Sequence, residues 1–233
     1  QGKEICYYES REVEYKVNFV DGQLQGEYIK YYESGEVKDR GNYVDGQLQG
    51  EYIGYYESGA VKDKTNFVDG IKQGEYIWSY KSGASKSKVN YVDGKKQGEF
   101  IQYYESGAVE GKGIYVDGVL NGEVRIYHKS GVLSAIKYFT DGTQQGQERN
   151  YYKSGELRRI KKYVDGEKQF EKTNYFKNGM VAESNTITDD GEEETIQYYE
   201  SGGIKWRSLY DEDGNLQESV EYYDCGEVKS KVN

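Results

Sequence analysis

The dipeptide Asp-Gly recurs along this chain at an almost constant interval, and this regularity constrains the fold more than any other feature. Its aspartates are evenly spaced, at positions 21, 45, 69, 93, 117, 141 and 165, and two further copies follow at 190 and 213. A second marker, Tyr-Tyr-x-Ser-Gly or a close variant, appears ten times and alternates with the first. A fixed period of this length indicates tandem supersecondary units rather than a chain folded around one centre.

Both markers are turn sequences. Asp-Gly is a preferred central pair of the type I′ hairpin turn, and Ser-Gly is a weaker member of the same group. The segments between markers hold nine or eleven residues, which suits strands. The sequence therefore predicts an all-β, elongated antiparallel β-meander of about 20 strands, in which each repeat is one hairpin. A parallel β-solenoid is the alternative, and it is disfavoured because parallel strands need longer crossovers.

The markers run through the whole chain, so we expect residues 1–233 to form a single array of about ten hairpin repeats. With neighbouring strands ~4.8 Å apart, such an array would be roughly 90 Å long. The stretches 1–22 and 180–233 are expected to be atypical or capping repeats. Arg11 stands where other repeats have glycine, Phe170 replaces a glycine within a strand, and the spacing slips after Met180.

Two-residue turns at both markers predict a register in which Tyr32 pairs with Val37 and Asp39 pairs with Tyr52. Side chains alternate between the faces of a strand. The predicted apolar face carries Tyr28, Tyr32, Val37, Tyr43, Leu48, Tyr52 and Tyr56. The predicted charged face carries Glu27, Ile29, Tyr31, Glu33, Glu36, Lys38, Arg40, Asn42 and Val44. A glycine inside each longer strand predicts a bulge, or leaves room for a ring: Gly26, Gly50, Gly74, Gly98, Gly122 and Gly146.

Composition sets limits on the function. The chain has no proline, 27 tyrosines and a formal charge of -10, and only 35% of it is hydrophobic. Disordered chains are poor in aromatic residues, so the tyrosines favour a folded protein with a weakly apolar core. The acidic balance argues against nucleic acid as a partner. No segment approaches the ~20 apolar residues that a membrane-spanning helix needs.

The pattern DG-x-x-x-G-E-x-x-x-Y-Y-x-S-G-x-V resembles the MORN-repeat variant of many bacterial proteins, along essentially the whole chain. The resemblance implies glycine- and aromatic-spaced β-hairpins. Proteins with such repeats include a family of antitoxins from toxin–antitoxin pairs, together with exported and surface proteins. MORN repeats more broadly serve as scaffolds for protein or lipid contact. The resemblance therefore implies a binding role and leaves the partner open.

One column of residues on the predicted charged face is the candidate binding site. Exposed aromatic side chains in a polar frame suit protein contact, and rings also stack on sugars. The alternative is that tyrosine only supplies strand propensity and screens the backbone of a thin sheet. The column, flanked by Ile29, Ile53, Ile77 and Ile101, consists of Tyr31, Tyr55, Tyr103, Tyr127, Tyr151, Tyr175, Tyr198 and Tyr222.

Other reactive residues fit structural roles. His128 occupies the Tyr32 position of its repeat, and no nucleophile or acid is spaced to serve it in catalysis. Cys6 and Cys225 belong to no metal-binding pattern, and the predicted length of the array argues against a disulfide between them. The acidic stretches 188–195 and 211–215 lack the spacing of a calcium loop and are expected to be solvated turns. We expect no catalytic residues, no metal and no cofactor.

These observations predict a non-enzymatic scaffold that presents a long, acidic, tyrosine-rich surface to another macromolecule. A protein is the expected partner, while carbohydrate binding by the tyrosine column, an antitoxin role and self-association are alternatives. The chain begins at Gln1 and its one methionine is Met180, so we expect a piece of a longer protein. Secreted or cell-surface placement in a bacterium is the predicted localisation, and a cytoplasmic one is the alternative.

Overall fold

The computed structural model describes residues 2–233, and every regular element within them is a β-strand. Contacts divide the chain into two compact units, a first that ends at Val119 and a second that begins at Leu120. The boundary falls inside the two-residue strand β13 (Val119–Leu120).

The strands of the first unit are β1 (Gly2–Tyr7), β2 (Val13–Val20), β3 (Gln23–Leu24), β4 (Gly26–Tyr31), β5 (Val37–Val44), β6 (Gln47–Leu48), β7 (Gly50–Tyr55), β8 (Val61–Val68), β9 (Ile71–Ser79), β10 (Ser85–Val92), β11 (Lys95–Tyr103) and β12 (Val109–Val116). The strands of the second unit are β14 (Gly122–Tyr127), β15 (Leu133–Thr140), β16 (Thr143–Tyr151), β17 (Leu157–Val164), β18 (Glu167–Tyr175), β19 (Val181–Ile187), β20 (Glu193–Tyr198), β21 (Ile204–Tyr210), β22 (Leu216–Tyr222) and β23 (Val228–Val232).

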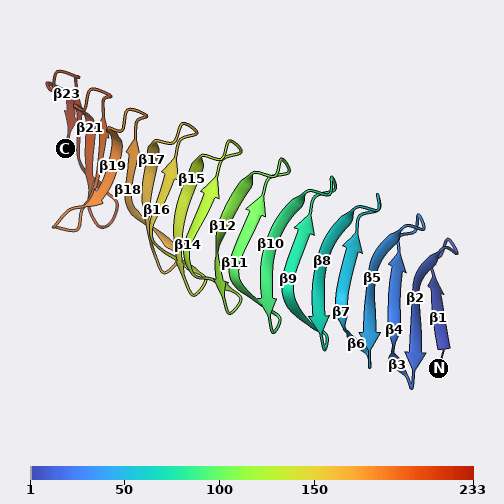
Figure 1. The fold of residues 1–233 in the computed structure, drawn as a ribbon. Coiled ribbons are helices and arrows are strands. Elements are labelled where there is room, and N and C mark those ends of the chain that lie inside the picture. The colour runs from blue at the N-terminus through green and yellow to red at the C-terminus, as the bar shows by residue number, and fades with distance from the viewer. Residues whose placement is uncertain (1) are drawn as a thin grey trace. The chain divides into compact units, whose positions relative to one another are not determined.

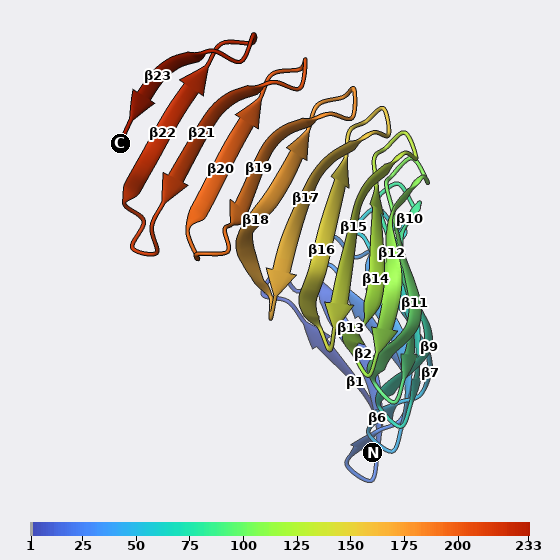
Figure 2. The same ribbon diagram turned by 90° about the vertical axis from the view of Figure 1, so that its left-hand side faces the viewer.

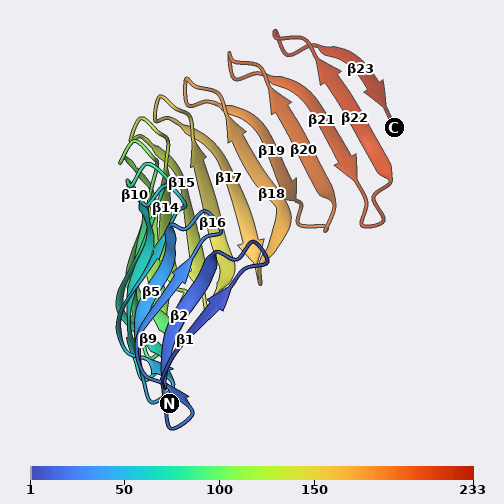
Figure 3. The same cartoon turned by 90° about the vertical axis from the view of Figure 1, so that its right-hand side faces the viewer.

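Each unit is an antiparallel meander, in which strands pair with those that precede and follow them along the chain. Figure 1 shows this succession from β1 onward, Figure 2 shows β18–β23 side by side in chain order, and Figure 3 shows β1 beside β2. The predicted all-β meander is confirmed, and the parallel solenoid is wrong. The residues that the structure describes form 23 strands, because β3, β6 and β13 are each separated by one residue from the strand that continues them.

The seven regularly spaced Asp-Gly turns are of the predicted type I′. Their aspartates have φ between 48° and 51° and their glycines have φ between 76° and 91°. Each of the six turns from Asp45 to Asp165 is also tied to the turn before it. The amide of Asp45, for example, donates to the side-chain oxygen of Gln25 at 2.8 Å, and the same bond recurs from Asp69, Asp93, Asp117 and Asp165. A glutamine in the preceding repeat therefore holds the next turn in place.

The Ser-Gly markers form three-residue loops, so the predicted two-residue turns are wrong there. The Tyr32 amide donates to the Glu36 carbonyl at 2.7 Å, and the Gly35 amide donates to the Tyr32 carbonyl at 2.9 Å. This is a type I turn followed by one left-handed residue, and only that last residue, Gly35 at φ 89°, needs to be glycine. Arg11 takes this position in the first loop at φ 73°, which is strained for a residue with a Cβ atom.

The last two Asp-Gly pairs also belong to three-residue loops rather than to type I′ turns. The Thr188 amide donates to the Glu192 carbonyl at 2.9 Å, and the Asp211 amide donates to the Asn215 carbonyl at 3.0 Å. Only Gly191 and Gly214 have positive φ in these loops. The slip in spacing after Met180 thus marks a change of turn type.

The longer loop changes the pairing next to it. Val37 lies opposite Tyr31 rather than Tyr32, so it shares the face of Tyr31. The register then shifts by one residue, and Tyr28 pairs with Gly41. The extra loop residue and the extra bulge residue offset each other, which is why most of the predicted face assignment is confirmed.

A second shift occurs at the glycine inside each longer strand. Tyr43 pairs with Leu48, but Asp39 pairs with Gly54 instead of the predicted Tyr52. A shift of two residues leaves each side chain on its original face. Gly26 and its equivalents have φ between 68° and 83°, and a Cβ atom there would meet nothing within 4 Å. The predicted bulge is confirmed, and the alternative, that these glycines leave room for a ring, is wrong.

The face that carries Tyr28, Tyr43 and Tyr52, called here the core face, differs between the two units. In the first unit, ring pairs with centroids 5.1–6.0 Å apart recur in successive repeats, from Tyr28–Tyr43 to Phe100–Tyr115. In the second unit, Val124 and then Glu148 hold the position of Phe100, and they are 7% and 4% exposed. Ser208 on the same face is fully buried. The core face thus carries ring pairs in the first unit and a mixture of apolar and polar buried residues in the second.

The opposite face, called here the charged face, carries Glu27, Ile29, Tyr31 and Arg40. Its isoleucines lie opposite cationic residues on both neighbouring strands. Ile53 pairs with Arg40 and Lys64, and it is only 8% exposed. Long cationic side chains can cover apolar surface with their methylene groups while their charges stay in water. The isoleucine column is therefore shielded.

Candidate functional site

The predicted tyrosine column lies on the charged face, at the end of each strand that enters a three-residue loop. All eight residues of the column are half-buried, so they are less accessible than predicted. The ammonium group of Lys16 lies 4.9 Å from the centroid of the Tyr31 ring. The Tyr31 ring thus lies against a lysine of its own sheet, and the role of the column in binding stays a prediction.

The second tyrosine of each marker, such as Tyr32, has a different, structural role. Its hydroxyl donates to the backbone carbonyl at the Tyr31 position of the following repeat, at 2.6–2.8 Å. These links are Tyr8 to Tyr31, Tyr32 to Tyr55, Tyr56 to Ser79, Tyr80 to Tyr103, Tyr152 to Tyr175 and Tyr199 to Tyr222. The second tyrosine of each pair therefore ties consecutive hairpins together at the loop edge.

His128 occupies the same structural position. Its Nε2 atom lies 3.3 Å from the Tyr151 carbonyl oxygen, so histidine takes the place of tyrosine in the link. This contact fits the structural role predicted for His128. Phe176 holds this position two repeats after His128, and it has no hydroxyl group to donate.

Replacing Tyr32 with phenylalanine is expected to destabilise the first unit by about 1 kcal/mol, because a carbonyl loses its donor at one loop edge. The reverse change, Phe176→Tyr, should stabilise the second unit by a similar amount. Urea unfolding followed by circular dichroism measures both changes. Tyr31→Phe is the matched control, since the Tyr31 hydroxyl takes no part in these links, and equal losses in Tyr31→Phe and Tyr32→Phe would contradict the assignment.

Three hollows recur on the charged face of the first unit, at one position of the repeat. The first has a volume of about 640 Å³, and the other two have volumes of about 300 and 240 Å³. The residues that define the position are Lys3, Lys16, Val17, Asn18 and Glu27 in the first, Glu27, Arg40, Gly41, Asn42 and Glu51 in the second, and Glu75, Lys88, Val89, Asn90 and Glu99 in the third. The second set lies one repeat after the first, and the third lies two repeats after the second.

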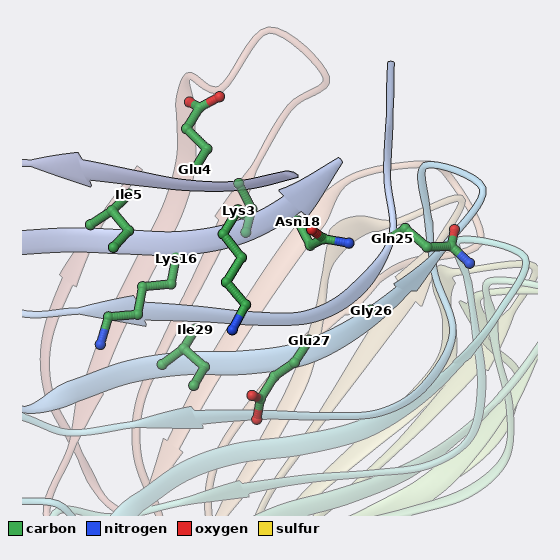
Figure 4. Close-up of a pocket in the computed structure, with 10 residues that line it drawn as sticks. Lys3, Glu4, Ile5, Lys16, Asn18, Gln25, Gly26, Glu27 and Ile29 are labelled. Atoms are coloured by element: carbon green, nitrogen blue, oxygen red, sulfur yellow. The ribbon is translucent and has the colours of Figure 1, made fainter. Parts of the chain in front are cut away.

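The hollows form beside the strand glycines. The Gln25 amide donates to the Asn18 carbonyl at 2.8 Å just before the register shifts at Gly26. Figure 4 shows the first hollow, with Lys3 and Glu27 beside it and Glu4 directed to the other side of the strands. Gly26 lines the first hollow, and the glutamates that follow Gly26, Gly50, Gly74 and Gly98 line the three hollows, so the hollows lie next to the predicted bulges.

A row of glutamates borders these hollows, and it was not singled out from the sequence. Glu27, Glu51, Glu75 and Glu99 directly follow the strand glycines, and all four are exposed. Glu51 forms an ion pair with Lys64, while the other three have no ion pair within the described chain. The Gly-Glu step in the repeat pattern was the signal that could have identified the row.

Two carboxylates lie close together on the core face of the first unit. Asp39 and Asp63 pair with Gly54 from opposite sides. Burial raises the pKa of Asp63, and the negative charge of Asp39 raises it further against the opposing effect of Lys62. Burial and Asp39 also raise the pKa of Tyr52. These groups are packed against one another, and residues 2–233 contain no cluster of three or more metal-ligating side chains.

The remaining candidates from the sequence have structural explanations. The Cys6 and Cys225 thiols are both free. The Asp211 carboxylate accepts hydrogen bonds from the backbone amides of Asn215 and Asp213, at 2.8 and 3.1 Å, and these bonds lower its pKa. This acidic stretch is therefore an internally bonded turn. The described chain has no helix that could span a membrane.

Comparison with known proteins identifies the repeat type. The family model described as "MORN repeat variant" matches residues 24–45, 48–69 and 96–117. A search of the curated proteins gives no significant match.

Among solved structures, the chain is similar to "Crystal Structure of TcdB2-TccC3-Cdc42", with 12% identity and a TM-score of 0.21. It is similar to "Structure of Photorhabdus luminescens Tc holotoxin pore, Mutation TccC3-D651A", with 12% identity and a TM-score of 0.20. It is also similar to "Crystal Structure of TcdB2-TccC3 without hypervariable C-terminal region", with 11% identity and a TM-score of 0.21. Each match covers 99% of this chain but only 16–17% of the other chain.

Proposed function

We propose that this protein, whose repeats are of the MORN variant, is a non-enzymatic scaffold that binds another protein through the charged face of its first unit. The observation that supports this proposal is the recurrence of one hollow at one position of the repeat. Similar features that recur along one face allow a partner to engage several of them at once, and this raises its apparent affinity.

The charges of the glutamate row favour a basic partner. Glu27, Glu75 and Glu99 have no competing ion pair within residues 2–233, so a cationic side chain would not have to displace an internal partner. Exposed charges at the rim of an interface increase the association rate and the specificity more than the affinity. The formal charge of -10 acts in the same direction. A partner with lysine or arginine side chains along an extended face fits this surface.

Two further predictions from the sequence can be tested together with this proposal. One is secreted or cell-surface placement, which fractionation of the source cells tests. The other is the antitoxin role, in which the bound protein would be a toxin. Identification of the captured partner decides between a toxin and another protein.

The test is capture of proteins from the source organism with the repeat array and with a variant in which the four glutamates of the row become glutamine. A partner of this face should bind the variant at least tenfold more weakly, since four exposed charge contacts at ~0.4 kcal/mol each amount to about tenfold in affinity. The matched control replaces four exposed glutamates of the loops, Glu33, Glu36, Glu57 and Glu105, and should retain the partner. Equal binding to both variants would rule out the glutamate row as the site.

A further inference from the structure

The two tryptophans of the chain lie in similar surroundings on the core faces of different units. Each borders a hollow lined by a lysine, a glutamine and a glutamate. The hollow at Trp78 in the first unit has a volume of about 120 Å³, and the hollow at Trp206 in the second unit has a volume of about 310 Å³. The two sets are Trp78, Lys86, Gln102 and Glu110, and Trp206, Lys205, Gln197 and Glu221.

The lysine distinguishes the two hollows. The Lys86 ammonium lies 3.8 Å from the centroid of a Trp78 ring and therefore covers the indole. Lys205 instead lies over Tyr199, with its ammonium 5.9 Å from that ring centroid. Within residues 2–233, no cation lies over the ring of Trp206. An indole face in a hollow of the second unit is thus left without a partner.

Two of the polar groups around the Trp206 hollow are held in place. The indole Nε1–H donates to the Ser219 hydroxyl at 3.0 Å, which fixes the plane of the ring. The Glu221 carboxylate accepts a hydrogen bond from the Lys229 ammonium at 2.8 Å, and this bond lowers the pKa of Glu221. Glu221 is therefore an ionised, oriented acceptor. The Gln197 carboxamide has no hydrogen bond within the described residues.

We infer that the Trp206 hollow binds a neutral saccharide, with one pyranose ring stacked on the indole. The face of an aromatic ring is electron-rich and attracts the positively polarised C–H groups on a sugar face. Glu221 can accept from sugar hydroxyls, Lys205 can donate to them, and Gln197 can do both. The volume lies at the lower end of the range for small-molecule sites. This site lies in the second unit, on the face opposite the tyrosine column, and does not depend on the proposed protein contact.

The test begins with an array of neutral glycans probed with the wild-type protein, and continues with fluorescence titration of the glycan that gives the strongest signal. The titration uses Trp78→Phe, in which Trp206 is the only tryptophan. Saturable quenching or enhancement of its fluorescence is expected. Trp206→Ala should bind at least tenfold more weakly, and Gln197→Ala, which keeps the indole, should bind several-fold more weakly with an unchanged unfolding temperature.

Two controls separate this site from the other candidates. Trp78→Phe should bind as the wild type does, because Lys86 already covers the Trp78 indole. Tyr151→Ala should also bind as the wild type does, because Tyr151 lies on the charged face. The inference is overturned if no neutral glycan binds above background. It is also overturned if binding is lost in Tyr151→Ala, or if it persists unchanged in both Trp206→Ala and Gln197→Ala.

Discussion

Replacing Glu148 with glutamine is expected to lower the free energy of unfolding by about 2 kcal/mol at pH 7, and by progressively less as the pH falls toward 2. Burial by itself would raise the pKa of this carboxyl group. Hydrogen bonds from Asn150, Gln144 and Lys161, together with the charge of Lys137, outweigh burial and lower the pKa to about 2. The carboxylate is thus stabilised in the folded state.

The sign of the pH dependence follows from that shift. The folded pKa of Glu148 lies below its unfolded value of about 4.5, so its charge adds stability above pH 4.5. This contribution is lost as the pH falls from about 4.5 toward 2, because the folded state resists protonation more than the unfolded state does. At neutral pH, glutamine keeps the shape but leaves the two lysine ammonium groups without their counter-ion.

Urea unfolding of the wild type and Glu148→Gln at pH 7, 4.5 and 3, followed by circular dichroism, measures the difference. Glu167→Gln is the control, since Glu167 is exposed and its side chain has no ion pair within residues 2–233. It should change stability by less than about 0.5 kcal/mol at each pH. A loss in Glu148→Gln that is equal at pH 7 and pH 3 would show that the charge of the carboxylate is not what stabilises the fold.

Replacing Phe100 with alanine is expected to destabilise the first unit by about 3 kcal/mol, with no dependence on pH between 3 and 7. Phe100 is 8% exposed, and its ring centroid lies 5.1 Å from that of Tyr115. Its cross-strand neighbours are Gly113 and Val89, so little else can fill the space that the ring leaves. The expected value is at the lower end of the range for phenylalanine because the sheet packs its apolar face against no second layer of secondary structure in its own unit.

Urea unfolding measures this loss, and native-state hydrogen exchange shows whether it is confined to amides of β10–β12. In a repeat array, the effect of a substitution is expected to concentrate in neighbouring hairpins. Phe100→Leu is the control, which should cost about 1 kcal/mol because it keeps most of the apolar volume. A loss below about 1 kcal/mol for the alanine variant would mean that ring packing contributes little to this unit.

Phe100 and Glu148 hold the same position of the repeat, and their repeats are two apart along the chain. The sequence places both on one face by alternation, but it does not reveal how a carboxylate can be buried there. Residues that meet Glu148 come from three strands: Lys137 from β15, Gln144 and Asn150 from its own strand β16, and Lys161 from β17. Their convergence depends on the register of both neighbouring strands, which single-strand patterns do not give.

The separation of adjacent tyrosines was predictable, but what each does was only partly so. Strand alternation is a local rule, and it directs Tyr31 and Tyr32 to different surroundings. The hydroxyl link from Tyr32 to the Tyr55 carbonyl joins two repeats, and it requires the loops to stack at one edge. The half-buried state of Tyr31 likewise depends on Lys16, a residue of the preceding hairpin.

By itself the sequence determined the hairpin repeat, the antiparallel order of the strands and the type I′ turns, because φ preferences and alternation act over a few neighbouring residues. Tertiary structure decided the three-residue loop at Ser34-Gly35, the bulge beside it that restores the register, and the two-residue shift at Gly50. It also decided where the hollows and the uncovered indole of Trp206 lie. These features arise from cross-strand pairing, in which the conformation of one hairpin sets which side chains of the next can meet.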